Sequence, residues 1–151
     1  MPKQVIDRDQ LIDEAYKIAS NDGISALSVR KVATACGIAV GSVYVYFPTK
    51  AGLTAAVLTR FFDETFSEEF CVVRAGERFT SYARRFRATL SEARASMSVD
   101  WFAQMRRLPS AEQEALEAVR APMLAHIERG LMRVLDGDEA VGRLVIEAWK
   151  A

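Results

Sequence analysis

The sequence predicts an all-α protein. Strand signals are nearly absent, because β-branched residues do not alternate with polar residues over any long stretch. Apolar residues instead recur every three or four positions along most of the chain, which is the spacing of an amphipathic helix. Half of the 151 residues are apolar, so the chain can bury a core of the size expected for one ordinary domain.

The charge of the chain is balanced. It carries 20 basic and 20 acidic residues, so its net charge gives no general attraction to nucleic acid, and any such binding must depend on where the charges lie. The sequence contains no run of 18 apolar residues, and its N-terminus is charged where a signal peptide would be apolar. We therefore expect a cytoplasmic protein without a membrane segment.

The two cysteines, Cys36 and Cys71, are too few for a disulfide framework. They show neither a CxxC pattern nor a Cys/His spacing, so no zinc site is predicted. We interpret them as small buried thiols, with oxidant sensing as the alternative.

The first predicted helix has clear signals at both ends. Asp7 and Gln10 have the spacing of an N-terminal capping box. Gly23 follows the last turn and suits a left-handed C-terminal cap. The apolar residues between them share one face: Leu11, Ala15, Ile18 and Ala19.

The second predicted helix is short. Ser28 is its expected N-cap, and the helix ends after barely two turns at Cys36 and Gly37. Its inner face consists of Val29, Val32 and Ala33.

The third predicted helix begins near Ala39. With a rotation of about 100° per residue, one side carries Val40, Val43 and Phe47 and is expected to pack. The other side carries Gly41, Ser42 and Val45. Tyr44 and Tyr46 lie on the two flanks, where a ring can contact the core while its hydroxyl points outward. Thr49 is expected to cap the next helix, with Lys50 in its first turn.

A short helix, a glycine turn and a second short helix form a helix-turn-helix unit, whose second helix lies in the DNA major groove. Small residues let that helix approach base edges, and hydroxyl or ammonium groups at its flanks bind phosphates. We expect base contacts from Gly41, Ser42 and Val45, and phosphate contacts from Tyr44, Tyr46 and Lys50. For Tyr46, simple packing is the alternative.

Residues from about Leu11 to Leu53 resemble the TetR family of bacterial transcriptional regulators. The motif is "SVRKVATACGIAVGSVYVYFPTKAGL". The resemblance implies that Arg30 and Val40 also face bases and that Ser28 also contacts phosphate. Ala39 departs from the pattern because a capping serine or threonine is common at that position. Tyr46 replaces a frequent histidine.

The rest of the chain is predicted to be helical. The expected helices run from Lys50 to about Cys71, over 77–94, over 96–105, from Ser110 with a kink at Pro122, and after an Asp138 cap.

The resemblance implies an N-terminal DNA-binding head at 1–50 and a helical effector-binding and dimerisation domain at 51–151. The pocket candidates are Tyr82, Phe86, Met97, Trp101, Phe102, Met105, Met123 and His126. Each of them has core packing as its alternative. His126 is the only histidine and has no ligand set around it, so we expect no metal site and no cofactor. The stretch "DEAVGRLVIEAWKA" resembles the first helix of a dimerising pair without the second, which indicates a truncated chain or a different dimer.

The leading hypothesis is a homodimeric repressor that binds a palindromic double-stranded DNA operator and is released by a small apolar effector. The alternative is a helical ligand-binding or adaptor protein without DNA-binding activity. An enzyme is disfavoured because the sequence shows no paired carboxylates, serine-histidine set or metal cluster.

Overall fold

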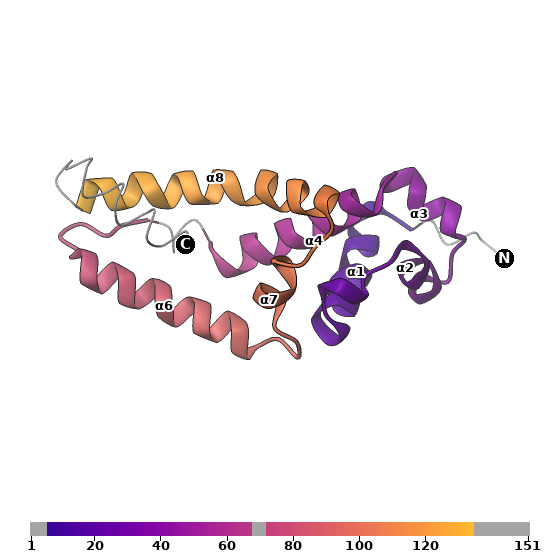
Figure 1. Cartoon of the computed structure of the whole chain (residues 1–151), viewed down its shortest axis with the longest axis horizontal. Helices are drawn as coiled ribbons and strands as arrows, with labels where there is room; N and C mark the ends of the chain where they lie inside the picture. The colour runs from indigo at the N-terminus through magenta and orange to yellow at the C-terminus, as the bar shows by residue number, and fades with distance from the viewer. Residues whose placement is uncertain (1–5, 68–71, 135–151) are drawn as a thin grey trace. The chain divides into compact units, whose positions relative to one another are not determined.

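The computed structural model describes residues 6–67 and 72–134, and within these ranges it contains helices and no strand (Figure 1). The predicted all-α class is therefore confirmed. The helices are α1 (Arg8–Asp22), the 3₁₀ helix η1 (Ile24–Ala26), α2 (Val29–Cys36), α3 (Val40–Tyr46), α4 (Lys50–Thr65), α6 (Phe79–Ala95), α7 (Trp101–Met105) and α8 (Ser110–Val134). None of these helices is long and apolar enough to cross a bilayer.

The chain folds into two compact units. The first unit comprises Met1–Phe61 and Arg94–Val119, and the second comprises Phe62–Ala93 and Arg120–Ala151. The first unit is thus built from two separate stretches of sequence. The predicted functional division after residue 50 stays a prediction.

Local capping explains where α1 and α2 begin. The Asp7 carboxylate accepts the Gln10 backbone N–H at 2.8 Å, and the Gln10 side chain accepts the Asp7 N–H at 3.2 Å. This is the predicted capping box. The Ser28 hydroxyl likewise accepts the Lys31 N–H at 3.1 Å. Gly37 ends α2 in the left-handed conformation with φ 65°, which favours glycine because it has no Cβ.

The conformation of Gly23 differs from the prediction. Its φ is 94° and its ψ is 156°, so the residue is not a left-handed cap. A long-range neighbour lies close to this residue, since a Cβ at Gly23 would lie 2.5 Å from Nε2 of Gln104 on α7. The Gln104 side chain also accepts the Ser25 backbone N–H at 3.0 Å. The positive φ favours glycine here, and a Cβ would also displace the end of the Gln104 side chain.

Trp101 lies at the centre of the first unit. Its side chain is 1% exposed, and its indole N–H donates to the backbone carbonyl of Ala19 at 2.9 Å. The Tyr16 ring meets it edge-on with centroids 5.7 Å apart, and the Phe61 ring is tilted against it at 5.1 Å. Trp101 therefore joins α1, α4 and α7 into one core.

Two predicted helix boundaries were wrong. The helix α4 ends at Thr65 and not near Cys71, because Phe66 and Ser67 already lie outside the helical conformation. The helix α7 begins at Trp101 and not at residue 96, because the Asp100 carboxylate accepts the Ala103 N–H at 3.1 Å as an N-cap.

The second unit has an aromatic core of its own. Phe66 stacks between Phe62 and Phe86, with ring centroids 5.9 and 5.8 Å apart. At the edge of this core, Nη2 of Arg85 lies 2.9 Å from Oε2 of Glu77, and the Arg85 guanidinium lies over the Tyr82 ring.

The pairing of Glu77 makes stability depend on pH. The hydrogen bond from Arg85 holds the pKa of the Glu77 carboxyl below its usual value. The resulting stabilisation is present above the pKa of the unfolded carboxyl, about 4.3, and is lost as the pH falls through the lower folded value. Glu77→Gln should therefore lower the free energy of unfolding by about 1 kcal/mol at pH 7.

The test is urea unfolding of both proteins between pH 7 and pH 3. The difference between them should narrow toward acid pH. Glu92→Gln, which changes an exposed carboxylate on α6, is the matched control and should alter stability by less than about 0.5 kcal/mol at neutral pH. A difference that stays constant with pH would show that the charge of Glu77 is not the source of stability.

Two predictions fall on residues outside the described ranges. These are the Asp138 cap with its following helix and the interpretation of Cys71.

Candidate nucleic-acid interface and a nearby pocket

The helix α3 packs through a narrow stripe. Val43 is fully buried, and Phe47 directly after the helix is buried as well. Val40, expected on the packing side, is 37% exposed, because the burial of α3 is confined to Val43. Almost all of α3 thus faces away from the core, as a helix that enters a groove must.

The ends of α3 follow from the local sequence. Ala39 supplies no side-chain hydrogen bond to the N-terminus, as its chemistry predicts. After α3, the Thr49 hydroxyl accepts the Gly52 N–H at 3.0 Å and so caps α4, which places Lys50 in the first turn as expected.

The Tyr46 hydroxyl has a partner within the chain. It donates to the backbone carbonyl of Ile6 at 3.0 Å. Two residues further along, the Arg8 guanidinium lies 5.1 Å from the centre of the Phe47 ring. The start of α1 is therefore held against the end of α3 by two contacts that the sequence did not indicate.

Lys50 also has a partner that the sequence did not indicate. Its Nζ lies 3.2 Å from Oε1 of Glu112 on α8, and the two side chains are 46% and 6% exposed. The same carboxylate oxygen accepts the hydroxyl of Thr54, which is fully buried, at 3.2 Å. Glu112 therefore accepts the hydrogen bond of Thr54 and forms an ion pair with Lys50. The ion pair keeps the Lys50 ammonium group beside α8.

Several other residues predicted to contact DNA lie on α2 and α3 or at the N-cap of α2. Gly41 and Ser42 are exposed on α3, and Arg30 is exposed on the second residue of α2. Ser28 is half-buried and accepts the Lys31 N–H, which leaves its own hydroxyl proton available to a phosphate oxygen. These residues thus lie on or directly before the two helices of the helix-turn-helix, with Arg30, Gly41 and Ser42 exposed.

The thiol of Cys36 is not primed for reaction. Burial raises its pKa above the usual value, and the charge of Glu14 adds to that effect. A raised pKa lowers the thiolate fraction at neutral pH, and the thiolate is the reactive form. Cys36 is half-buried, so the expected full burial is met only in part, while its raised pKa argues against the alternative of oxidant sensing.

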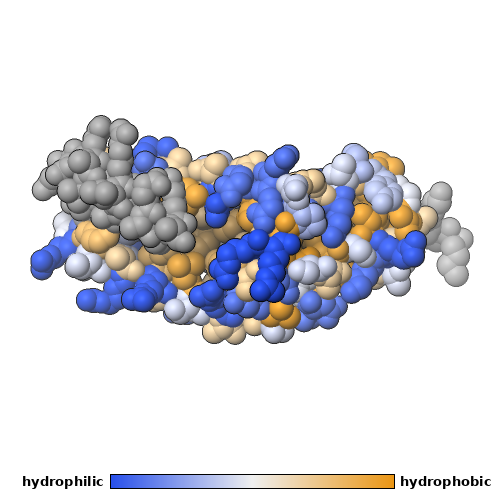
Figure 2. All heavy atoms as spheres, in the orientation of Figure 1, coloured by the Kyte–Doolittle hydropathy of each residue, from blue (hydrophilic) through white to orange (hydrophobic). Residues whose placement is uncertain are grey.

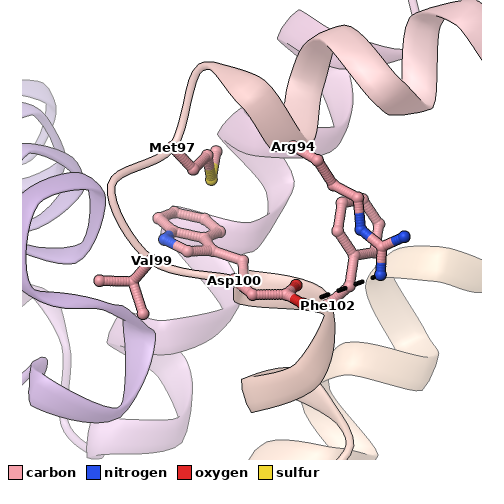
Figure 3. Close-up of a pocket in the computed structure, with 6 residues that line it drawn as sticks. Arg94, Met97, Val99, Asp100 and Phe102 are labelled. Atoms are coloured by element: carbon pink, nitrogen blue, oxygen red, sulfur yellow. Dashed lines mark ion pairs between the residues drawn. The ribbon is translucent and has the colours of Figure 1, made fainter.

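A pocket of about 280 Å³ lies beside α7, within the first unit (Figure 3). It is lined by Arg94, Met97, Val99, Asp100, Trp101 and Phe102. Figure 3 shows the Arg94 side chain across the Phe102 ring, with its guanidinium directed at the Asp100 carboxylate. The Nη2–Oδ2 distance is 3.8 Å, and the guanidinium lies 5.0 Å from the ring centre.

The pocket brings together three of the eight predicted lining residues, Met97, Trp101 and Phe102. Met105 is buried in the same unit without lining this pocket. The remaining four belong to the second unit, where Tyr82 and Phe86 are buried and Met123 and His126 are half-buried. Within the described ranges, no group of three or more His, Cys, Asp or Glu side chains could hold a metal ion.

Comparison with known proteins identifies the helix-turn-helix region. Residues 11–57 match the family described as bacterial regulatory proteins, tetR family. A similar relative is an uncharacterized HTH-type transcriptional regulator, YuxN of Bacillus subtilis, which is 31% identical over 67 residues. The transcriptional repressor KstR of Mycolicibacterium smegmatis is 39% identical over 56 residues, and that of Mycobacterium tuberculosis is 40% identical over 55.

These matches concern a limited part of each protein. The YuxN match covers 44% of this chain and 23% of the relative, and the first KstR match covers 37% and 28%. A crystal structure of the multidrug binding protein EbrR complexed with imidazole resembles the fold more widely. It covers 99% of this chain and 82% of its own, with a TM-score of 0.55 and 20% identity.

Proposed function

We propose that the chain is a sequence-specific DNA-binding transcriptional regulator of the TetR family, because residues 11–57 match the model of that family and the similar relatives are transcriptional regulators. The observation that carries the proposal is the exposure of α3. Of the seven residues in this helix, only Val43 is buried. A helix that follows a tight turn and leaves its surface uncovered is the part of a helix-turn-helix that enters the major groove.

The flanks of α3 supply the groups that would hold DNA phosphates. Lys50 is a cation whose side chain is still nearly half exposed beside Glu112. Ser28 carries a hydroxyl at the N-cap of α2, and Tyr44 carries one on α3. The Tyr46 hydroxyl already donates to the backbone carbonyl of Ile6. We assign the phosphate contacts to these four residues, with Tyr46 acting partly by holding the start of α1.

Lys50→Ala tests this assignment. Each phosphate contact that is lost should reduce the slope of log affinity against log salt by about 0.9. The measurement is titration of the full chain onto DNA from the region upstream of its own gene, by fluorescence anisotropy at several salt concentrations. We expect weaker binding at low salt and a shallower slope for the variant.

The matched control is Lys17→Ala. Lys17 is an exposed lysine in the same unit that pairs with Glu14 at 2.6 Å and has no assigned DNA contact. If the two variants change the slope equally, or neither changes it, the assignment of Lys50 fails. If the parent protein binds DNA without salt dependence, or not at all, the regulator proposal fails and a helical binding or adaptor protein is the better interpretation.

We further propose that the regulator is a homodimeric repressor released by a small apolar effector. Repressors are among the relatives, and the pocket beside α7 offers Met97, Trp101 and Phe102 as apolar walls with Arg94 and Asp100 as polar groups. An occupant that displaces Trp101 would disturb its hydrogen bond to Ala19 on α1. To lower DNA affinity, the effector must bind the DNA-free arrangement more tightly than the DNA-bound one. The remaining candidates for the effector site are Tyr82, Phe86, Met105, Met123 and His126.

A further inference from the structure

The exposed apolar side chains of the described chain are concentrated on α3. Within residues 6–67 and 72–129, five large hydrophobic residues are exposed: Val40 at 37%, Tyr44 at 47%, Val45 at 77%, Tyr46 at 38% and Val72 at 47%. Four of the five lie on this one helix of seven residues. In Figure 2, hydrophobic atoms reach the surface in the region of α3. Single exposed apolar residues are ordinary, but such a cluster marks a contact surface.

The polar groups usually used to read bases are absent from α3. Its sequence, VGSVYVY, contains no arginine, lysine, asparagine, glutamine, aspartate or glutamate. These side chains make the bidentate contacts to guanine and adenine and accept from cytosine in the major groove. The Ser42 hydroxyl remains, but it can donate or accept and therefore discriminates poorly between bases. The chemistry that α3 can offer to base edges is mainly aliphatic.

The nearby hydroxyl and ammonium groups do not change this conclusion. The Tyr46 hydroxyl proton is directed to the Ile6 carbonyl, and the Lys50 ammonium is held beside Glu112. With Tyr44 assigned to a phosphate and Ser42 discriminating poorly between bases, the side chains of α3 left to read a base edge are the methyl groups of Val40 and Val45. The apolar group that a base pair presents in the major groove is the 5-methyl group of thymine.

Gly41 supports a close approach of α3 to the bases. A Cβ built at Gly41 would meet no atom of the protein within 4 Å, and φ is not positive there, so neither packing nor backbone conformation requires glycine. Glycine inside a helix nevertheless costs about 0.5–1 kcal/mol relative to alanine. Its presence between the exposed Val40 and Ser42 leaves room for a partner outside the chain.

We infer that α3 recognises thymine 5-methyl groups in the major groove, with Val45 and Val40 as the contacting side chains. This inference rests on the proposed DNA-binding function. It places thymine in each half-site of the operator, opposite α3, and leaves hydrogen-bonded readout of other bases to Arg30 on α2.

The experiment removes single methyl groups from the DNA. Operator sequences are first selected with the full chain from a random duplex library that contains thymine. Selected duplexes are then synthesised with deoxyuridine in place of each half-site thymine in turn, because uracil lacks only the 5-methyl group. At one or more positions in each half-site, the substitution should weaken binding about fourfold, the change expected for one buried methyl group.

Protein variants connect the methyl group to the valine. Val45→Ala and Val40→Ala should each weaken binding to the thymine duplex by a similar factor. On the duplex that carries deoxyuridine at the contacted position, the matching valine variant should bind as the parent does, because the contact is already lost. Val72→Ala truncates an exposed valine of the second unit and should bind as the parent does on both duplexes.

Three results would overturn the inference. The first is that the selected half-sites contain no thymine. The second is that the protein binds thymine and deoxyuridine duplexes with equal affinity. The third is that the affinity losses caused by Val45→Ala and by deoxyuridine are additive at every position, because additive losses mean that the valine and the methyl group do not touch. In all three the selection itself succeeds, so the regulator proposal survives. If no sequence is enriched from the thymine library, the proposed function fails and the inference fails with it.

Discussion

Replacing Trp101 with alanine is expected to lower the free energy of unfolding by about 3–5 kcal/mol, the usual cost of truncating a large buried aromatic side chain. The ring is 1% exposed and lies between Tyr16 of α1 and Phe61 of α4. Its removal leaves a cavity at a junction of three helices. The substitution also removes the hydrogen bond that the indole N–H donates to the Ala19 carbonyl. That carbonyl still accepts the Gly23 N–H at 2.8 Å.

Trp101→Phe separates the two contributions. Phenylalanine keeps most of the packing and loses the indole N–H, so it should cost clearly less than alanine, with the lost hydrogen bond contributing about 0.5–1.5 kcal/mol. The measurement is urea unfolding followed by circular dichroism at a fixed protein concentration. A loss below about 1 kcal/mol for Trp101→Ala would show that α7 does not anchor this core.

Val45→Glu is expected to abolish specific DNA binding while leaving the fold intact. Val45 is 77% exposed, so the substitution should change the free energy of unfolding by less than about 0.5 kcal/mol. On DNA, the new carboxylate would face base edges and phosphates and would have to lose its water. Like-charge contacts in an interface cost several kcal/mol, so affinity should fall by about 100-fold or more.

The matched control is Val72→Glu. It introduces the same charge at another exposed valine, in the second unit, and should reduce affinity by less than about threefold through net charge alone. Binding is measured by anisotropy at fixed salt, and thermal unfolding checks the fold. Equal losses from the two variants would mean that net charge governs binding and that α3 does not enter the groove.

Sequence patterns predicted the features that depend on neighbouring residues. The Asp7–Gln10 capping box, the Ser28 cap, the end of α2 at Gly37 and the Thr49 cap each involve partners no more than a few positions apart. Such contacts are encoded in short motifs, so they can be recognised without knowing the fold. The start of α7 could have been predicted in the same way, because Asp100 stands three residues before the N–H that it accepts.

The contacts that the sequence did not indicate all join distant positions. Glu112 meets Lys50 and Thr54, and Gln104 meets Gly23 and Ser25. No local pattern distinguishes Glu112 from the other glutamates of α8, because its burial arises only when α8 packs beside α4. The pocket contains Met97, Trp101 and Phe102, and helical spacing could not assign them and Tyr82 to different units.

The contacts of Trp101, Gln104 and Glu112 have a consequence for chimeric regulators. The region that matches the family model ends at residue 57, but the compact unit that contains α3 also includes Arg94–Val119. A chimera joined just after residue 57 would contain α3 but would lack Trp101, which packs in the core of the first unit, and Glu112, which pairs with Lys50. Operator specificity should therefore be exchanged by grafting the exposed side chains of α3, or by moving both stretches of sequence together.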